Sequence, residues 1–119
     1  MELDKIRTEY YTVAINNSLK ELIDRYKATD EVLYALDDRK LILYLVNLAL
    51  DEGLGVSTGE ITLSGVKDIK LKKTKKISLH FNCVNEKYKN HGVKVSSRQY
   101  FHRLLVKFLS VKLSIVPEV

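Results

Sequence analysis

The segment of residues 39–52 most constrains how this chain can fold. Asp37 and Asp38 precede it and can cap a helix, and Gly53 ends it, so it is predicted to be helical. Apart from Asn47, which we expect to satisfy a buried hydrogen bond, apolar side chains surround it almost completely: Leu41, Ile42, Leu43, Tyr44, Leu45, Val46, Leu48, Ala49 and Leu50. Such a helix is buried on most sides, so we expect it to be the central helix of the domain.

Helical spacing also marks the chain before this segment. Residues 3–27 contain no Gly or Pro and carry apolar side chains three and four positions apart, which predicts a helix that is kinked or split near Ser18. Ser18 and Glu21 match a capping box at that point. Thr29 and Asp30 then offer an N-cap for a short helix that runs to residue 36.

Strand and turn signals follow Gly53. Residues 60–63 and 69–72 are predicted to be short strands, with turns at Gly65 and at residues 73–75. Residues 77–83 alternate apolar and polar side chains, which favours a strand to Phe81 and then a helix over 82–90. The same region also places Phe81, Val84 and Tyr88 on one helical face, so the boundary between strand and helix is open.

The most distinct helix start lies at Ser96. Ser96 is the expected N-cap, and Gln99 completes a capping box. The predicted helix covers residues 96–109 and turns an apolar side toward the core, with Phe101, Leu104, Leu105 and Phe108. Residues 112–116 are predicted to form a final strand, and Pro117 ends the structured chain.

The length of 119 residues and the hydrophobic content of 45% suit one compact domain with a modest core. We expect a single α+β, mostly helical domain over residues 1–119. It consists of an N-terminal helical extension over 1–36 and a core over 37–116.

The net charge is divided unevenly along the chain. Residues 1–60 carry 7 basic and 12 acidic side chains, a net charge of −5, whereas residues 61–119 carry 13 and 3, a net charge of +10. A basic half of this kind favours a polyanionic partner, because neutralising phosphates releases condensed counterions. The alternative is a highly charged surface of the kind found in thermostable proteins, although that would mix the two signs.

The outer face of helix 96–109 has side chains suited to DNA. With the apolar side in the core, Gln99 and Arg103 point outward, flanked by Ser96, Tyr100, His102 and Lys107. Arg can bind guanine O6 and N7, and Gln can pair with adenine N6 and N7. Ser96, Ser97 and Arg98 lie at the helix N-terminus, which favours a phosphate. The alternative is an ordinary amphipathic surface helix.

A second basic element lies over residues 59–78, which we expect to be a β-hairpin. Six lysines fall within ten residues: Lys67, Lys70, Lys72, Lys73, Lys75 and Lys76. The hairpin is expected to contact the DNA backbone. Alternatively, its lysines protect an exposed edge strand from aggregation.

The order of these segments resembles a known domain. The apolar helix 39–52, the turn-like VSTGEI at 56–61, VNEKYK at 84–89 and GVKVSSRQY at 92–100 follow one another as in the C-terminal winged-helix domain of archaeal origin-recognition (replication initiator) proteins. The resemblance implies a winged helix-turn-helix and sequence-specific duplex binding through helix 96–109, supported by a wing. A transcription regulator or a mobile-element protein of the same fold, archaeal or viral, is an equal alternative.

Other classes of site have weaker support. His80, Cys83, His91 and His102 lack the paired spacing of a zinc site, so we expect no metal and no cofactor. Tyr100 lacks the histidine pair that a nicking enzyme needs, and the glycines form no phosphate loop, so we expect no enzyme and no small-molecule substrate. RNA ranks below double-stranded DNA, because the aromatic side chains form no stacking cluster.

The expected setting is the cytoplasm. A single cysteine, Cys83, precludes an intramolecular disulfide, the N-terminus lacks a signal-peptide pattern, and no apolar run can span a membrane. The main alternative to a DNA-binding protein is an assembly module that binds other proteins. The N-terminal helix could also pair with its own copy, and such a homodimer would suit palindromic DNA.

Overall fold

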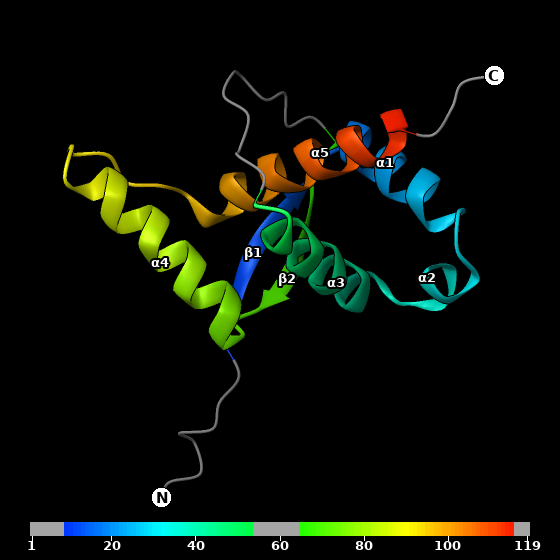
Figure 1. Ribbon diagram of the computed structural model, residues 1–119, viewed down its shortest axis with the longest axis horizontal. Helices are drawn as coiled ribbons and strands as arrows, with labels where there is room; N and C mark the ends of the chain where they lie inside the picture. The colour runs from blue at the N-terminus through cyan, green and yellow to red at the C-terminus, as the bar shows by residue number, and fades with distance from the viewer. Residues whose placement is uncertain (1–8, 54–64, 116–119) are drawn as a thin grey trace, which may run out of the picture.

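The computed structural model describes residues 9–53 and 65–115 (Figure 1). Over these residues the protein is α+β and mostly helical, which confirms the predicted class. The elements in chain order are β1 (Tyr10–Ile15), α1 (Asn17–Lys27), α2 (Glu31–Ala35), α3 (Asp38–Asp51), β2 (Lys67–Lys72), α4 (Lys75–Lys89) and α5 (Ser97–Ile115).

β1 and β2 form a two-stranded antiparallel ribbon whose register runs from Tyr10 opposite Lys72 to Ile15 opposite Lys67. Side chains alternate between its two faces. One face is apolar and buried in the core, through Val13, Ile15, Ile69 and Leu71. The other face, called the open face below, carries the exposed or half-buried side chains of Tyr10, Thr12, Asp68, Lys70 and Lys72, and the buried Ala14.

α5 packs against β1, α1 and α3, and Figure 1 shows it crossing the ribbon while α4 leaves the body to one side. Its predicted apolar side is confirmed, since Phe101, Leu104, Leu105 and Phe108 are fully buried. An aromatic cluster joins three elements, because Phe101 contacts Tyr11 of β1 and Phe81 of α4. α5 therefore ties the ribbon to the remaining helices.

α3 is the helix predicted from residues 39–52. The Asp37 carboxylate caps it by accepting a hydrogen bond from the Lys40 N–H at 2.9 Å, and Gly53 follows its end with a φ of 65°. Only one side is buried, through Leu41, Ile42, Leu45, Val46 and Ala49, whereas Tyr44 is 42% exposed. The Asn47 side chain donates to the Leu43 carbonyl within the same helix. α3 is thus less enclosed than its composition predicts.

Side-chain caps set the starts of the other helices. The Asp30 carboxylate caps α2, as predicted, by accepting from the Val32 N–H at 2.7 Å. The Ser96 hydroxyl accepts from the Gln99 N–H at 3.4 Å at the start of α5, also as predicted. The predicted capping box at Ser18 is wrong, because the buried Asn16 side chain caps α1 by accepting from the Leu19 N–H.

The predicted helix over residues 3–27 is wrong over its first described part. Tyr10–Ile15 is a strand, rich in the aromatic and β-branched side chains that favour a pleated surface, and its buried side chains pair across the ribbon with those of β2. Residues 3–8 lie outside the described part of the chain. A homodimer built on one continuous N-terminal helix therefore loses its structural basis.

Residues 77–81 form part of α4, and the predicted strand there is wrong. Thr74 caps this helix by accepting from the Ile77 N–H at 3.2 Å. A strand would have placed Ile77, Leu79 and Phe81 on one face, but Ile77 and Phe81 are buried while Leu79 is 57% exposed. The helical spacing of the apolar side chains therefore prevails over their alternation.

The predicted basic hairpin and the predicted final strand also need correction. The predicted strand over 69–72 is confirmed as part of β2, but its partner is β1, and the predicted strand 60–63 lies outside the described residues. Residues 112–115 continue α5 as helix instead of forming a strand, while Val116 and Pro117 are not among the described residues.

Phe101→Ala is expected to lower the free energy of unfolding by about 3–5 kcal/mol, because it removes the buried ring that joins β1, α4 and α5. Leu79→Ala is the control, since its exposed side chain is expected to cost less than about 0.5 kcal/mol. Urea unfolding followed by circular dichroism measures both values. Similar decreases for the two variants would contradict this packing.

Candidate nucleic-acid interface

The outer face of α5 carries a line of polar side chains. Gln99 and Lys107 are exposed and Arg103 is half-buried, at positions four residues apart and therefore on one side of the helix. Ser96 and the half-buried Ser97 lie at the N-terminal end of this line. We call Gln99, Arg103 and Lys107 the α5 stripe. Of the residues predicted on or beside the outer face, Gln99 and the flanking Lys107 are exposed, and Arg103 between them is half-buried.

Tyr100 points toward α4 and away from the α5 stripe. Its hydroxyl lies 2.6 Å from Nε2 of His80, and its ring packs against Phe81. Burial raises the pKa of Tyr100, and the nearby Tyr88 raises it further. Burial lowers the pKa of His80. The pair holds α4 against the first turn of α5, so Tyr100 has a structural role in addition to any contact with a ligand.

His102 is not on the outer face, which corrects its predicted place beside the DNA. It is 2% exposed, and its Nδ1–H donates to the Ala14 carbonyl at 2.7 Å. Burial lowers the pKa of its imidazole, the hydrogen bond to Ala14 acts in the opposite direction, and the charges of Arg103 and Arg98 lower it again. The missed signal was Leu109, which lies seven residues on at nearly the same angle around the helix and is also buried.

The open face of the ribbon provides the second part of the candidate interface. Lys70 and Lys72 are exposed on it, two residues apart, so their Cα atoms lie about 7 Å from each other along the strand. Neither lysine has an ion pair with any residue that the structure describes. Their ammonium groups are therefore available to an anionic partner.

An ion pair joins the first turn of α5 to the ribbon. Arg98 in the first turn of α5 donates from Nε to the Asp68 carboxylate at 2.9 Å. Asp68 precedes Lys70 by two residues and therefore projects from the same face of β2. The N-terminus of α5 thus lies at one end of the ribbon, with Asp68 of the open face held against its first turn. Arg98 is half-buried and engaged in this contact, so we assign it to positioning.

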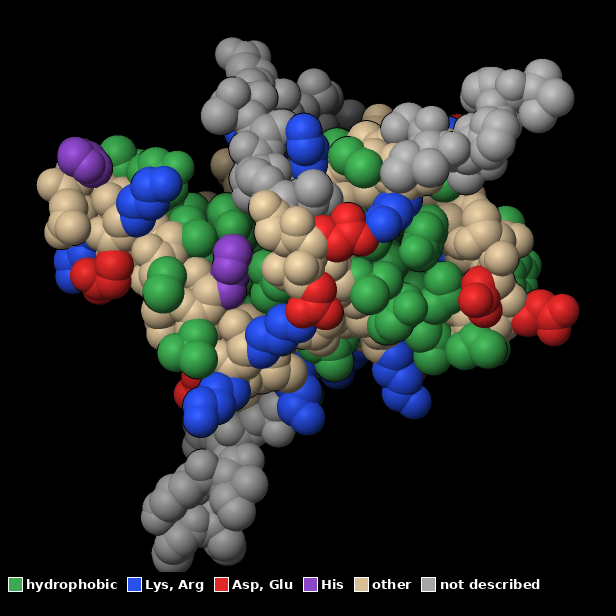
Figure 2. All heavy atoms as spheres, in the orientation of Figure 1, with side chains coloured by type: hydrophobic (Ala, Val, Ile, Leu, Met, Phe, Trp, Pro, Cys, Tyr) green, Lys and Arg blue, Asp and Glu red, His purple; other side chains and the backbone are tan. Residues whose placement is uncertain are grey.

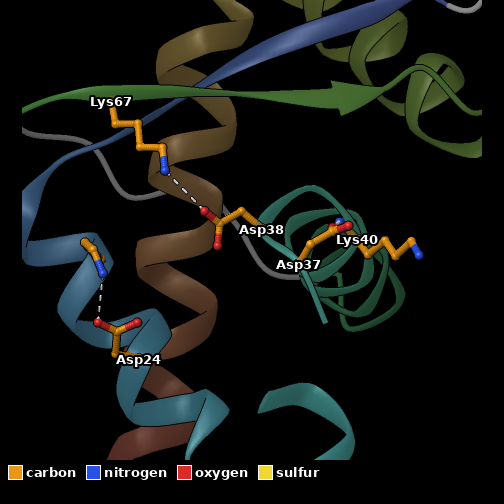
Figure 3. A network of polar contacts seen from close by, with 6 residues as sticks. Asp24, Asp37, Asp38, Lys40 and Lys67 are labelled. Carbon is orange, nitrogen blue, oxygen red and sulfur yellow. Dashed lines mark hydrogen bonds and ion pairs between the residues drawn. The ribbon is translucent and has the colours of Figure 1, made fainter. Parts of the chain in front are cut away.

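The other predicted lysines divide into two groups. Lys67, Lys73 and Lys76 pair with Asp38, Glu9 and Asp51, respectively. Figure 3 shows Lys67 reaching from β2 to Asp38 at the start of α3, beside the Asp37 cap. Lys75, by contrast, is exposed and has no ion pair among the described residues. These pairs join the acidic and basic halves of the chain, which is why sequence alone could not identify the lysines left unpaired.

Surface chemistry differs between the two sides of the molecule. In Figure 2, hydrophobic side chains gather over α1, α2 and α3, whereas basic side chains lie along the edge where β2 meets α4 and on α4 itself. By sequence, residues 65–115 carry 13 basic and 2 acidic side chains, and residues 9–53 carry 5 and 9. The two halves of the chain thus differ in charge, although ion pairs such as Lys67–Asp38 and Lys112–Glu52 bring them together in space.

Metal-ligating residues do not gather anywhere in the part of the chain that the structure describes. His80 contacts Tyr100, His102 contacts Ala14, and Cys83 is exposed on α4. None of the helices within residues 9–53 and 65–115 is long and apolar enough to cross a membrane.

Comparisons with protein-family models, with curated protein sequences and with solved structures find no match to this chain. The resemblance to archaeal origin-recognition proteins thus stays a prediction from the sequence, and the candidate interface rests on the geometry above.

Stability is expected to fall as the pH drops below about 6.5, because an unfolded imidazole takes up a proton near that pH while the buried His102 resists it. His102→Gln should reduce the fall in thermal midpoint between pH 7.5 and pH 5. The control is His91→Gln, at an exposed position after α4, which should retain the wild-type fall. Differential scanning calorimetry measures the thermal midpoints. Equal pH dependence in the two variants would show that His102 does not cause the loss of stability at low pH.

Proposed function

We propose that this protein binds duplex DNA and performs no chemistry on it. The observation that carries the proposal is that the α5 stripe and the open face both present polar or basic side chains, and that Lys70 and Lys72 on the open face have no ion pairs with described residues. Lysines of this kind neutralise phosphates and release counterions, which supplies affinity for any sequence. The stripe supplies groups that can distinguish one base pair from another.

Each part of this surface has a distinct role in the proposal. Arg103 binds a guanine edge and Gln99 an adenine edge in the major groove, while Lys107 contacts the backbone farther along the helix. Ser96 and Ser97 place hydroxyls at the positive end of the α5 dipole, where a phosphate is stabilised. Lys70, Lys72 and Lys75 contact the DNA backbone from the ribbon and from the start of α4.

The winged-helix arrangement belongs to the same proposal. A domain of that type combines a recognition helix with a β-ribbon that touches the DNA backbone, and here α5 and the β1–β2 ribbon are the corresponding parts. The ribbon joins two segments far apart in the chain, so it differs from a wing made of one hairpin. The role we infer is that of a transcription regulator or an accessory factor in replication or mobile-element transfer, acting in the cytoplasm.

A protein-assembly module is the second candidate, and one observation favours it. Val32 and Tyr34 on α2 are each 69% exposed, at the hydrophobic side of the molecule. Large apolar side chains in such a position favour contact with another protein. An apolar interface of this kind would be insensitive to salt, whereas binding to DNA weakens steeply with salt.

Fluorescence anisotropy with random-sequence duplex DNA at low and moderate salt separates the two candidates. We expect binding that weakens steeply as salt rises. No binding at low salt would contradict the proposal and favour the assembly role.

Lys70→Gln combined with Lys72→Gln is expected to weaken binding to all duplex sequences about equally. The slope of log affinity against log salt should become shallower by about 0.9 for each phosphate that the protein no longer neutralises. The matched control is Lys67→Gln with Lys73→Gln, which removes the same charge from lysines already paired with acids. Equal changes of slope in the two double variants would show that the open face is not part of the DNA interface.

Arg103→Ala is expected to cost about 1–3 kcal/mol of binding free energy on a selected site and to relax its sequence preference. Arg25→Ala, at an exposed position on α1, is the control and should leave both unchanged. Site selection from a random pool followed by titration of the preferred duplex measures the two effects. Unchanged preference in Arg103→Ala would show that the α5 stripe does not read bases.

A further inference from the structure

α4 reaches well beyond the packed body of the molecule. Its first half is attached, with Ile77 and Phe81 buried and His80 beside the Tyr100 hydroxyl. In the second half every side chain except the half-buried Val84 and Asn85 is exposed. Figure 1 shows the helix leaving the body before the chain turns back toward α5. We call residues 82–94 the α4 arm.

The end of the arm has a defined turn. Gly92 has a φ of 76°, its N–H donates to the Lys89 carbonyl at 2.9 Å, and the Val93 N–H donates to the Tyr88 carbonyl at 3.0 Å. This is the hydrogen-bond pattern of a Schellman motif, which ends a helix by turning the chain in the left-handed region. The turn brings Lys94 back beside the last turn of α4.

Positive charge concentrates at this end. Lys87, Lys89 and Lys94 are exposed, Glu86 is the one acidic residue of the arm, and none of the four forms an ion pair within the described residues. Between the helix end and the returning chain lies an open groove of about 370 Å³, lined by Asn85, Lys89, Gly92, Val93 and Lys94. Two ammonium groups and an amide around an open groove suit an anionic group such as a phosphodiester.

The chain connects this groove directly to the α5 stripe. Lys94 is separated from Ser97, the first residue of α5, by two residues. The hydrogen bond between His80 and Tyr100 fixes the base of the arm to the same turn of α5. A ligand that lies along the stripe therefore has the arm beside it, at the N-terminal end of the helix.

We propose that the groove at the end of the α4 arm, with Lys89 and Lys94, is a second phosphate-binding point for the duplex that the α5 stripe contacts. This inference rests on the proposed function. It extends the footprint beyond the surface of α5 and the open face, and it explains why basic side chains cluster on a part of the helix that adds little to the core.

Lys89→Gln combined with Lys94→Gln tests the inference in the full chain. On random-sequence duplex DNA, the slope of log affinity against log salt is expected to become shallower by about 0.9 for each of the two phosphates that these lysines neutralise. The matched control is Lys27→Gln with Lys40→Gln, which removes the same charge on the opposite side; Figure 3 shows Lys40 extending away from its neighbours. An unchanged thermal midpoint in both double variants establishes that each is folded.

The outcomes separate the two proposals. If the wild-type chain binds duplex DNA and the arm variant keeps the wild-type slope, the arm inference is overturned while the proposed function stands. If the wild-type chain fails to bind at low salt, both are overturned. If the arm variant and the control variant change the slope equally, the effect is one of net charge, and the arm inference is again overturned.

Discussion

The packing of α5 on β1 is the contact on which the rest of the structure depends. Phe101 meets Tyr11 in the aromatic cluster, and one residue on, the buried His102 donates to the Ala14 carbonyl. These contacts bury one face of the ribbon and one side of α5 together. The faces that remain are the open face and the α5 stripe, so the same packing that forms the core also determines which polar side chains reach solvent.

The sequence predicted correctly those helices for which a capping residue and the spacing of apolar side chains indicate the same start. The starts of α2, α3 and α5 follow from Asp30, Asp37 and Ser96, because capping depends on residues only a few positions apart. β1 could not be found in this way, because its spacing also fits a helix and its pairing partner is β2, more than fifty residues away. The prediction placed His102 on the outer face because it took too narrow a buried side for α5. The buried side also includes Leu109 and His102.

The sequence was enough to predict which types of residue form the candidate site. It was not enough to predict which of the lysines lack an ion pair. The concentration of lysine in the second half of the chain is visible in the sequence, and the outward direction of Gln99, Arg103 and Lys107 follows from helical phase. The pairing of Lys67, Lys73 and Lys76 with acids from the first half needs tertiary structure. Acids of the first half therefore engage part of the basic half, whereas Lys70, Lys72 and Lys75 stay exposed and form no ion pair with a described residue.

The antiparallel ribbon also sets the order in which the chain can fold. Ile15 pairs with Lys67 and Tyr10 with Lys72, so β1 leaves the ribosome long before β2 has been made. Until β2 and α5 follow, the apolar side chains of β1 lack the strand and the helix that cover most of them, and contacts of such long range close slowly. The N-terminal strand is therefore the segment most in need of protection during synthesis, and a chain cut after α3 would leave it without a partner.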